Sequence, residues 1–584
     1  MTNRTIKTTK NKRFFVDEDF KLDKWEDIAK YYTRLSEKTI ENIEDFLVFL
    51  QNRSELESII SEDFAWRYIK MTCDTNNEIH KADFDFFIQN IQPQIAPFDD
   101  ILNKKIMQSD FKTQVSEENT DWKGLGIALK GMQASIDVFE EQNIPLFVQI
   151  QQLSSQYQSL NGSMSVEIDG ETKTLQQAGV WLENPDRAKR ESVYRTIQER
   201  RQLDTVQIDA IFDQLVELRH QVATNAGFDD YVQYSFKAMR RFDYTEEDCA
   251  DFHNAVQKTI IPILNQLADK RKEKLNIDTL KPWDKNVDIS QKPTLKPFEN
   301  ATDLLEKTIL CFDKIDPFLG DCMKEMKARK RLDLESRLGK APGGYNYPLE
   351  ETGFPFIFMN ASSLMRDVIT MIHEGGHAVH SILTKDLKIN SFRNFPSEVA
   401  ELASMSMELI SMEHWEVFFE NTDELNRAKI QHLEDILATL PWVATVDKFQ
   451  HWIYKNPNHS QTERNNAWLN IFESLSDNVT DWNDLQHFKQ SLWHKQLHIF
   501  ELPFYYIEYG IAQLGAIAVW KNYKENKEKG LEAYLSALSL GYKKSINEIY
   551  SEANISFDFS ETNIKNLITF VQNEIQTINS TINA

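Results

Sequence analysis

The chain has very few cysteines for its length. Four occur among 584 residues, widely spaced and without a CxxC pair: Cys73, Cys249, Cys311 and Cys322. This pattern excludes a small disulfide-stabilised secreted fold and indicates buried free thiols in a reducing compartment. The basic start, residues 1–15, also lacks the apolar segment of a secretory signal, so we expect a cytoplasmic protein.

Long apolar runs and an excess of positive charge are absent as well. No stretch of 18 apolar residues occurs, so we expect no membrane-spanning helix. The formal net charge is −24 and the isoelectric point is about 5.1, which argues against nucleic acid or an anionic membrane as a partner. The rest is an ordinary globular composition, with 41% hydrophobic and 27% charged residues.

Glycine and proline are sparse, at 18 and 16 residues, which leaves few places where a helix must stop. Apolar residues recur every three or four positions in long stretches, for example 40–49, 208–222 and 430–440. Together these features predict a mostly α-helical protein with short connections. Because 584 residues exceed the usual size of one core, we expect at least two packed subdomains.

Two segments before the middle of the chain depart from the helical pattern. Residues 160–176 alternate in character and contain Gly162 and Gly170, which predicts a small hairpin inside a helical region. Residues 274–300 are polar and contain three prolines, which predicts a long connection, placed between subdomains.

A second group of signals follows near the middle of the chain. Residues 339–348 (GKAPGGYNYP) carry the strongest loop signal, and residues 354–360 form a short aromatic segment typical of a strand. Ser362 or Ser363 is then placed to cap a helix that ends near residue 383.

That helix contains the run HEGGH, with His373 and His377 at its ends and Glu374 between them. Four residues make just over one turn, so both imidazoles project from one face and can share a cation. Zinc suits two neutral imidazoles and a carboxylate, with a fourth position left for water. The carboxylate of Glu374 can reach that water and take its proton during attack on a peptide carbonyl.

One alternative accompanies the motif. A helix with two surface histidines would show the same spacing without any metal. However, Gly375 and Gly376 each cost roughly 1 kcal/mol in a helix relative to alanine, and a double glycine suits the close approach of another backbone. The context therefore favours a metal site.

The third ligand is expected from the segment PSEVAE, where Ser397 is a plausible helix cap. Glu398 and Glu401 are both candidates. Glu398 lies in the first turn, where the helix dipole alone explains an acid. Glu401 lies deeper, among small apolar residues, and an acid there requires a partner such as a metal. Glu408 follows on roughly the same face and can support a ligand from behind.

HEGGH followed by VAELASMSMEL resembles the M3 family of peptidases, which includes thimet oligopeptidase, neurolysin and oligoendopeptidase F. Glu401, in its ExxS setting, matches the family's third ligand. DVITMIHEGGHAVH is similar to the oligoendopeptidase F branch, where Asp367 occupies the position of a frequent acid. A helix-start role is the favoured explanation of Asp367. His380 follows the motif closely, but two histidines and a glutamate already complete the site, so we favour a non-ligand role.

The C-terminal run HIFELPFYYIEY resembles the family's cluster of histidine and tyrosines. Pro503 fits the first position of a helix, which puts Tyr505 and Tyr509 one turn apart on one face. Core packing explains that spacing without the family. The resemblance implies that both phenols donate hydrogen bonds to the tetrahedral oxyanion and that His498 is a further donor to the substrate. The glycine-pair loop and third tyrosine of the mammalian-type enzymes are missing, so the tyrosine assignment stays open.

The resemblance implies a mostly α-helical, two-lobed metallopeptidase with a deep substrate channel and a small β-sheet next to the zinc helix. Residues 1–195 would form a helical part of the channel wall, and residues 196–584 the zinc-dependent catalytic region. We expect residues 356–360 to form an edge strand that binds extended peptides by their backbone. Gly343 and Gly344 either let that peptide approach or form a simple tight turn.

The expected activity is that of a zinc metalloendopeptidase with one Zn²⁺ per chain, which cleaves internal bonds of short oligopeptides. Three alternatives stay open: a zinc carboxypeptidase of related helical fold, a catalytically weak peptide-binding protein on the same scaffold, and a metal-dependent hydrolase of non-peptide substrates. The intact Glu374 argues against a mere binding protein. The sequence does not fix the oligomeric state or the preferred cleavage site.

Overall fold

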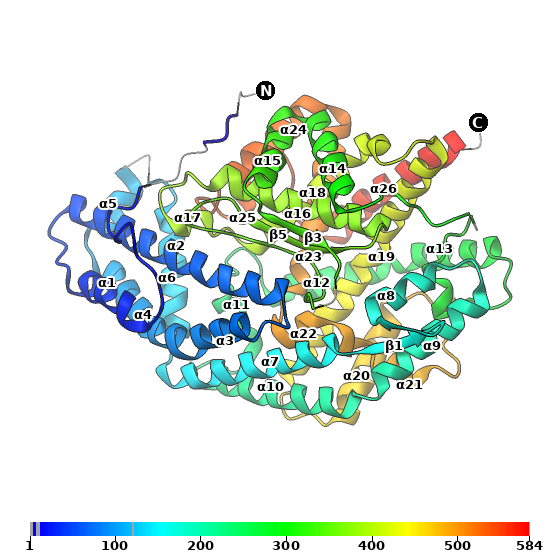
Figure 1. Cartoon of the computed structure of the whole chain (residues 1–584), viewed down its shortest axis with the longest axis horizontal. Helices are drawn as coiled ribbons and strands as arrows, with labels where there is room; N and C mark the ends of the chain where they lie inside the picture. The colour runs from blue at the N-terminus through cyan, green and yellow to red at the C-terminus, as the bar shows by residue number, and fades with distance from the viewer. Residues whose placement is uncertain (1–3, 8–11, 119–121, 291, 338, 583–584) are drawn as a thin grey trace.

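The computed structural model describes residues 4–7, 12–118, 122–290, 292–337 and 339–582. Part of the basic N-terminal stretch considered above lies outside these ranges. The described chain is dominated by helices, with two small sheets, as predicted (Figure 1). Among the described residues, no helix combines the length and apolar character needed to span a bilayer.

The helices fall into two groups, before and after the larger sheet. Those before it are α1 (Trp25–Glu37), α2 (Ile43–Cys73), α3 (Glu78–Phe86), α4 (Gln92–Gln108), α5 (Phe111–Glu118), α6 (Leu125–Val138), α7 (Ile144–Gly162), α8 (Leu175–Gly179), α9 (Arg187–Gln202), α10 (Thr205–Asn225), α11 (Tyr231–Ala238), α12 (Glu246–Thr259), α13 (Ile261–Lys274), α14 (Ala301–Ile315) and α15 (Pro317–Ala328). Those after it are α16 (Met365–Thr384), α17 (Asn390–Arg393), α18 (Ser397–Ser411), α19 (Thr422–Lys455), α20 (Gln461–Ser474), α21 (Gln486–Gln490), α22 (Leu497–Glu501), α23 (Tyr506–Glu525), α24 (Lys527–Ser539), α25 (Ile546–Glu552) and α26 (Glu561–Ile582).

The stretches 208–222 and 430–440 lie in α10 and α19, and 40–49 runs into α2 from residue 43, so their helical prediction is confirmed. Short polar side chains fix where several helices begin. Asn42 accepts a hydrogen bond from the backbone of Asp45 at the start of α2, and Ser460 accepts one from Glu463 at the start of α20. These caps satisfy N–H groups that have no partner inside the helix.

The predicted hairpin is confirmed. Strands β1 (Ser165–Ile168) and β2 (Glu171–Thr174) pair antiparallel across Asp169 and Gly170. Both turn residues have positive φ, 55° and 79°, which is the requirement of a tight two-residue turn that matches the twist of its strands. The predicted connection is also confirmed, because residues between α13 and α14 hold only one short 3-10 turn, Pro282–Asp284, within their described part.

The larger sheet has the order β3 (Leu332–Glu335), β5 (Phe356–Ala361), β4 (Tyr345–Tyr347). β3 runs parallel to β5, and β4 runs antiparallel to it. Two predictions were therefore wrong. The segment 356–360 is the central strand and cannot add a peptide at its edge, and the second half of the predicted loop 339–348 is a strand. β4 was missed because its three paired residues are flanked by the prolines and glycines that predicted a loop.

β5 is buried on both faces, which explains its unbroken apolar sequence. Phe356 and Phe358 pack with Ala65 and Ile69 of α2, whereas Ile357 belongs to the large core on the side of α16. The sheet thus lies between an N-terminal helix and the helix that carries the HEGGH motif (Figure 1).

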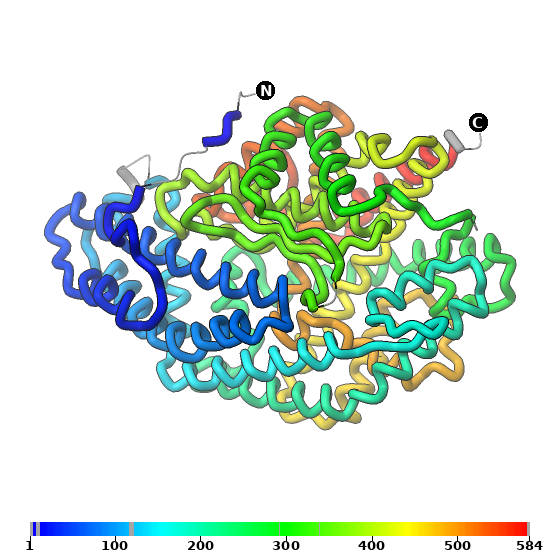
Figure 2. Tube along the Cα trace, viewed as in Figure 1, coloured from blue at the N-terminus to red at the C-terminus, as the bar shows by residue number. Residues whose placement is uncertain are grey.

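Apolar side chains form two main clusters. One gathers residues of α1, α2 and α4–α6 and is joined by Ile389 and Phe392, which follow the motif helix in the chain. The other begins at Leu153 and continues to Ile575, and it includes the residues around the motif. In Figure 2 the green segment with the sheet and motif helix lies between the blue N-terminal helices and the yellow to red C-terminal ones. Residues far apart in sequence therefore meet at this segment.

Candidate metal centre and active site

The motif helix α16 begins one residue after Leu364, and neither predicted serine caps it. Ser363 instead adopts a positive φ of 65°. Asp367 provides the cap, since its Oδ2 accepts hydrogen bonds from the backbone of Ser362 at 2.7 Å and Leu364 at 3.0 Å. The helix-start reading of Asp367 is confirmed by this geometry. The sequence predicted the wrong cap because a serine that caps a helix and a serine that only precedes one look the same in the local sequence.

The double glycine brings α16 against α18, as expected from its cost in a helix. A Cβ atom on Gly376 would lie 2.7 Å from Cα of Ser404 and 2.9 Å from the carbonyl oxygen of Ala403. Contacts this short are not tolerated, so only glycine permits the approach. On Gly375 a Cβ atom would meet the ring of Phe312 at 2.9 Å. The close approach sets Glu401 of α18 opposite the two imidazoles.

His373, His377 and Glu401 form a group whose ligand atoms all lie within 4.8 Å of one another. Nε2 of His373 lies 3.3 Å from Oε2 of Glu401, and Nε2 of His377 lies 3.8 Å from the same oxygen. The imidazole side chains keep 18% and 17% of their surface exposed, so an ion and a substrate can reach them. This donor set, two imidazoles and one carboxylate converging on one point, fits zinc.

The electrostatics of the group suit a cation. Burial lowers the pKa of His377 to about 4, which keeps that imidazole neutral and able to bind metal. Burial alone would raise the pKa of Glu401, but the two imidazoles and Tyr505 hold it at about 2. Burial also opposes the charged form of His373, yet Glu401 and Glu408 raise its pKa above the usual value. Metal binding would displace that proton.

Glu408 holds His373, the first candidate ligand, through the ring nitrogen that faces away from Glu401. Its Oε1 lies 2.7 Å from Nδ1 of His373, which leaves Nε2 of that ring facing Glu401. The other carboxylate oxygen of Glu408 lies 3.5 Å from Nε2 of His432, on α19. The predicted supporting position of Glu408 is thus observed, whereas His432 escaped prediction because nothing in its local sequence marks a contact with a helix so distant in the chain.

Glu408→Gln is expected to weaken zinc binding about 10- to 100-fold, because the outer partner fixes the ring and raises its basicity. Competition with a chromophoric chelator would measure the affinity. Glu416→Gln is the matched control, since Glu416 is an exposed acid paired with Lys314 and has no contact with the site. Equal affinity of the Glu408 variant and the wild-type protein would remove Glu408 from this supporting role.

Glu374 is 7% exposed, and burial raises its pKa to about 7. A carboxylate with such a pKa can both accept and return a proton near neutrality. Its backbone is held by β4, where Nδ2 of Asn346 donates to the carbonyl oxygen of Glu374 at 3.1 Å. The motif helix and the edge of the sheet are therefore joined at the residue predicted to be the base.

The C-terminal residues also reach the site. Helix α23 begins at Tyr506, later than the predicted start at Pro503, because Phe504 takes a positive φ of 68°. Tyr505 and Tyr509 nonetheless lie one turn apart, with ring centroids separated by 5.5 Å. Tyr505 Oη donates to Oε1 of Glu401 at 2.8 Å. Tyr509 Oη lies 3.2 Å from Nε2 of His498.

His498 is held from its other side. Its Nδ1 lies 3.0 Å from Nε2 of Gln496, whose Oε1 accepts a hydrogen bond from Trp442 at 3.1 Å. Burial lowers the pKa of His498 to about 4, so the ring is neutral. Gln496 and Trp442 were missed from the sequence, where a glutamine and a tryptophan carry no metal or proton chemistry of their own. Only their position beside His498 gives them a role.

The remaining candidates lie elsewhere. Glu398 accepts a hydrogen bond from Tyr244 at 2.6 Å and is absent from the ligand group around the motif. His380 is buried and stacks on Phe395, with ring centroids 3.6 Å apart. Gly343 has φ +96° and open space where a Cβ atom would be, so its position permits both readings.

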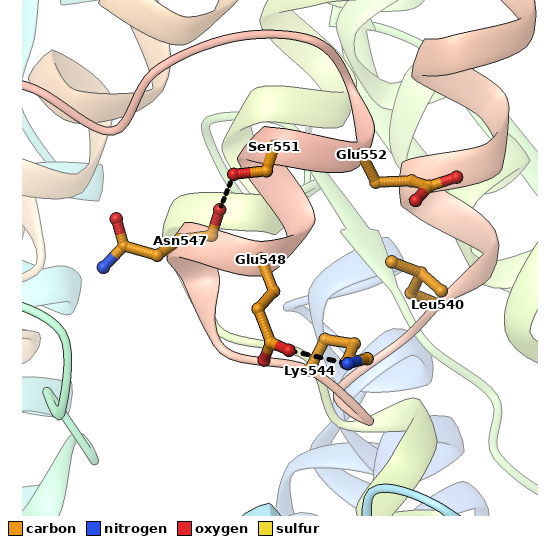
Figure 3. Close-up of a pocket in the computed structure, with 6 residues that line it drawn as sticks. All are labelled: Leu540, Lys544, Asn547, Glu548, Ser551 and Glu552. Atoms are coloured by element: carbon orange, nitrogen blue, oxygen red, sulfur yellow. Dashed lines mark hydrogen bonds and ion pairs between the residues drawn. The ribbon is translucent and has the colours of Figure 1, made fainter.

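A surface depression of about 400 Å³ lies apart from these residues (Figure 3). Its lining residues are Leu540, Lys544, Asn547, Glu548, Ser551 and Glu552. Nζ of Lys544 donates to Glu548 at 2.6 Å, so the cation in its wall is already paired. None of the motif residues lines it, and the His–Glu cluster is the better candidate for catalysis.

A helix with two imidazoles and an acid between them, completed by a carboxylate from a second helix, defines the site of a metallopeptidase. Comparison with known proteins gives the family. Residues 180–567 match the model described as peptidase family M3, and residues 15–122 match the peptidase M3 N-terminal domain. The chain belongs to peptidase family M3 and is a peptidase.

Individual relatives agree with this assignment. An oligoendopeptidase F homolog of Borreliella burgdorferi is 22% identical over 87% of this chain and 86% of its own length. The solved structure of PZ peptidase A with an inhibitor is 26% identical, with a TM-score of 0.90 over 97% of this chain and 99% of the other. Oligoendopeptidase F of Enterococcus faecium, 14% identical, shares the fold with a TM-score of 0.65 over 96% and 98% of the two chains. The predicted relationship to oligoendopeptidase F is confirmed.

Proposed function

We propose that the chain is a zinc metalloendopeptidase that hydrolyses internal bonds of short oligopeptides. One zinc ion at this site would be held by His373, His377 and Glu401. The observation that carries the proposal is the convergence of their three ligand atoms within 4.8 Å beside the buried carboxylate of Glu374. Relatives named oligoendopeptidase F and oligopeptidase support oligopeptides as the substrate class.

The chain's own residues divide the chemistry among them. When bound, zinc would supply Lewis acidity that polarises water and the scissile carbonyl. Glu374 takes the proton from the attacking water and passes it to the leaving amine. The raised pKa of Glu374, about 7, suits a group that must both accept and donate. Tyr505, Tyr509 and His498 offer donors where negative charge develops on the carbonyl oxygen.

The two phenols should contribute differently. Tyr509→Phe is expected to lower kcat by about a hundredfold with little change in KM, since an oxyanion donor acts in the transition state. Tyr505→Phe should also weaken zinc binding, because Tyr505 donates to the ligand Glu401. Steady-state kinetics and measurements of zinc affinity on the two variants check these expectations. Tyr523→Phe, a buried tyrosine at the far end of the same helix, is the control. Normal turnover in both variants would return these phenols to a packing role.

Strand β4 is the better candidate for backbone binding, because it lies at the edge of the sheet and is joined to Glu374 through Asn346. An extended peptide added to this edge would be read by its main chain, which implies broad side-chain preference. Tyr345 of β4 contacts Thr72 of α2, with 2.6 Å between their hydroxyl oxygens. This contact joins α2, within residues 1–195 that we propose form part of a channel wall, to the sheet of the proposed catalytic region, residues 196–584.

A narrow channel would admit extended oligopeptides and exclude folded proteins. The proposed enzyme should therefore cut peptides of roughly 6 to 20 residues at internal bonds, because an extended chain spans about 3.3 Å per residue. A folded protein, and intact casein, should survive. The four free thiols fit the predicted cytoplasmic location. In that compartment the enzyme would encounter such peptides.

Mass spectrometry of a timed digest tests this proposal. Internal fragments from a mixed peptide pool, with casein intact, are the expected result. Stepwise loss of single C-terminal residues would favour the carboxypeptidase alternative, and rapid cutting of casein would exclude a closed channel. Binding without any product would favour the peptide-binding alternative, and a pool left unbound would direct the search to non-peptide substrates.

A further inference from the structure

A second cluster of metal-ligating side chains lies between α12 and α19, away from the HEGGH motif. Each helix contributes two residues one turn apart: Cys249 and His253 from α12, Asp447 and His451 from α19. This spacing places both members of each pair on one helix face, the same device by which the motif helix presents its histidines. The two faces meet, so four potential ligands converge in the interior.

The ligand atoms of Cys249, Asp447 and His451 all lie within 4.8 Å of one another. Nε2 of His451 lies 3.4 Å from Oδ2 of Asp447. Nε2 of His253 lies 2.8 Å from the same oxygen and fixes the carboxylate. The other oxygen, Oδ1, is buried and has no hydrogen-bond partner among the described residues. A fully buried carboxylate oxygen without a partner is costly unless something binds it.

The charges of this cluster match a divalent cation. A carboxylate and a thiolate carry two negative charges, and neutral imidazoles add none. Arg241 lies close enough to influence Cys249, but it is paired with Glu508 at 3.1 Å and does not fill the cluster. The side chain of His451 keeps 16% of its surface exposed, which gives an ion a way in.

We propose that Cys249, Asp447 and His451 bind a second divalent metal ion, with His253 holding the coordinating carboxylate in place. A thiolate, an imidazole and a carboxylate are a ligand set that suits zinc or cobalt, and water reaching the His451 side completes the coordination. Burial raises the pKa of the Cys249 thiol, so binding releases its proton to solvent. The expected metal content therefore rises from one ion per chain, as predicted from the sequence, to two.

The position of this site gives it a structural role. The ring of His451 packs against Phe504, with centroids 5.2 Å apart. Phe504 is the residue with positive φ directly before Tyr505, and its backbone N–H donates to Gln450 on α19 at 3.0 Å. A metal ion on α12 and α19 would therefore stabilise the turn that presents Tyr505 to the catalytic site.

Cobalt distinguishes the two proposed sites by its absorption, because only the site of Cys249, Asp447 and His451 contains a thiol. The protein is loaded with Co²⁺, desalted and examined by absorption spectroscopy and elemental analysis. Wild-type protein should hold about two ions per chain and show a thiolate-to-cobalt charge-transfer band in the near ultraviolet. His377→Ala, which removes a ligand of the motif site, should hold about one ion and keep the band.

Cys249→Ser should also hold about one ion but lose the band, and Cys322→Ser, a buried thiol on α15, should keep it. If Cys249→Ser does not fold, His451→Gln takes its place, and it should likewise lose the band. A His377→Ala protein without ion or band overturns the second site, as does a band that survives Cys249→Ser. Neither result touches the motif site, whose zinc and peptidase activity are measured separately.

Discussion

Glu374→Gln is expected to keep zinc at the motif site and to lose turnover by a factor on the order of 10² to 10⁴. The amide has nearly the shape of the carboxylate but cannot take a proton from water. The backbone of residue 374 is held by Asn346 through its carbonyl oxygen, so the substitution leaves that contact in place. Peptide turnover by chromatography, together with zinc content, checks the prediction.

Two outcomes would contradict it. Turnover within a few-fold of the wild-type value would exclude Glu374 as the base. Loss of zinc would show that the substitution disturbs the ligands, and the kinetic result could then not be assigned to proton transfer. A fall in kcat with unchanged zinc and similar KM is the pattern of an interaction used in the transition state.

The candidate ligands His373 and His377 and the candidate base Glu374 could be named from the sequence because they lie in one turn of one helix. HEGGH fixes three side chains by spacing alone, and Glu401 followed from an acid placed among small apolar residues. The structure brings these four residues together. The helical fold class was equally accessible, since its signal is repeated along the whole chain.

What escaped prediction depends on partners far apart in sequence. The strand order of the sheet makes β5 central and β4 the edge, and no local pattern contains that order. His432 and Gln496 act only through Glu408 and His498, which they meet in three dimensions. The positive φ of Phe504 delays the start of α23, although Pro503 is a good first residue of a helix.

The second large effect concerns the third ligand. Glu401→Ala is expected to lose the motif-site zinc, and with it almost all peptidase activity, because a catalytic zinc site needs its three protein ligands. The structure offers a matched control three residues earlier on the same helix. Glu398→Ala should keep zinc while lowering stability by about 1–3 kcal/mol, since it leaves the buried hydroxyl of Tyr244 without its acceptor.

Elemental analysis and thermal unfolding separate the two acids. The expected pattern is one fewer zinc ion per chain in Glu401→Ala and a lowered Tm with unchanged zinc in Glu398→Ala. The reverse pattern would make Glu398 the ligand. Glu401 would then be an acid that only accepts the hydrogen bond from Tyr505 and does not hold the metal.

Dependence of peptide hydrolysis on zinc tests the central claim most directly. Wild-type protein stripped by a chelator should lose its peptidase activity and regain it when zinc is added, whereas Glu401→Ala treated in the same way should stay inactive. Full activity of the stripped wild-type protein, with its zinc shown to be absent, would contradict a zinc peptidase centred on His373, His377 and Glu401.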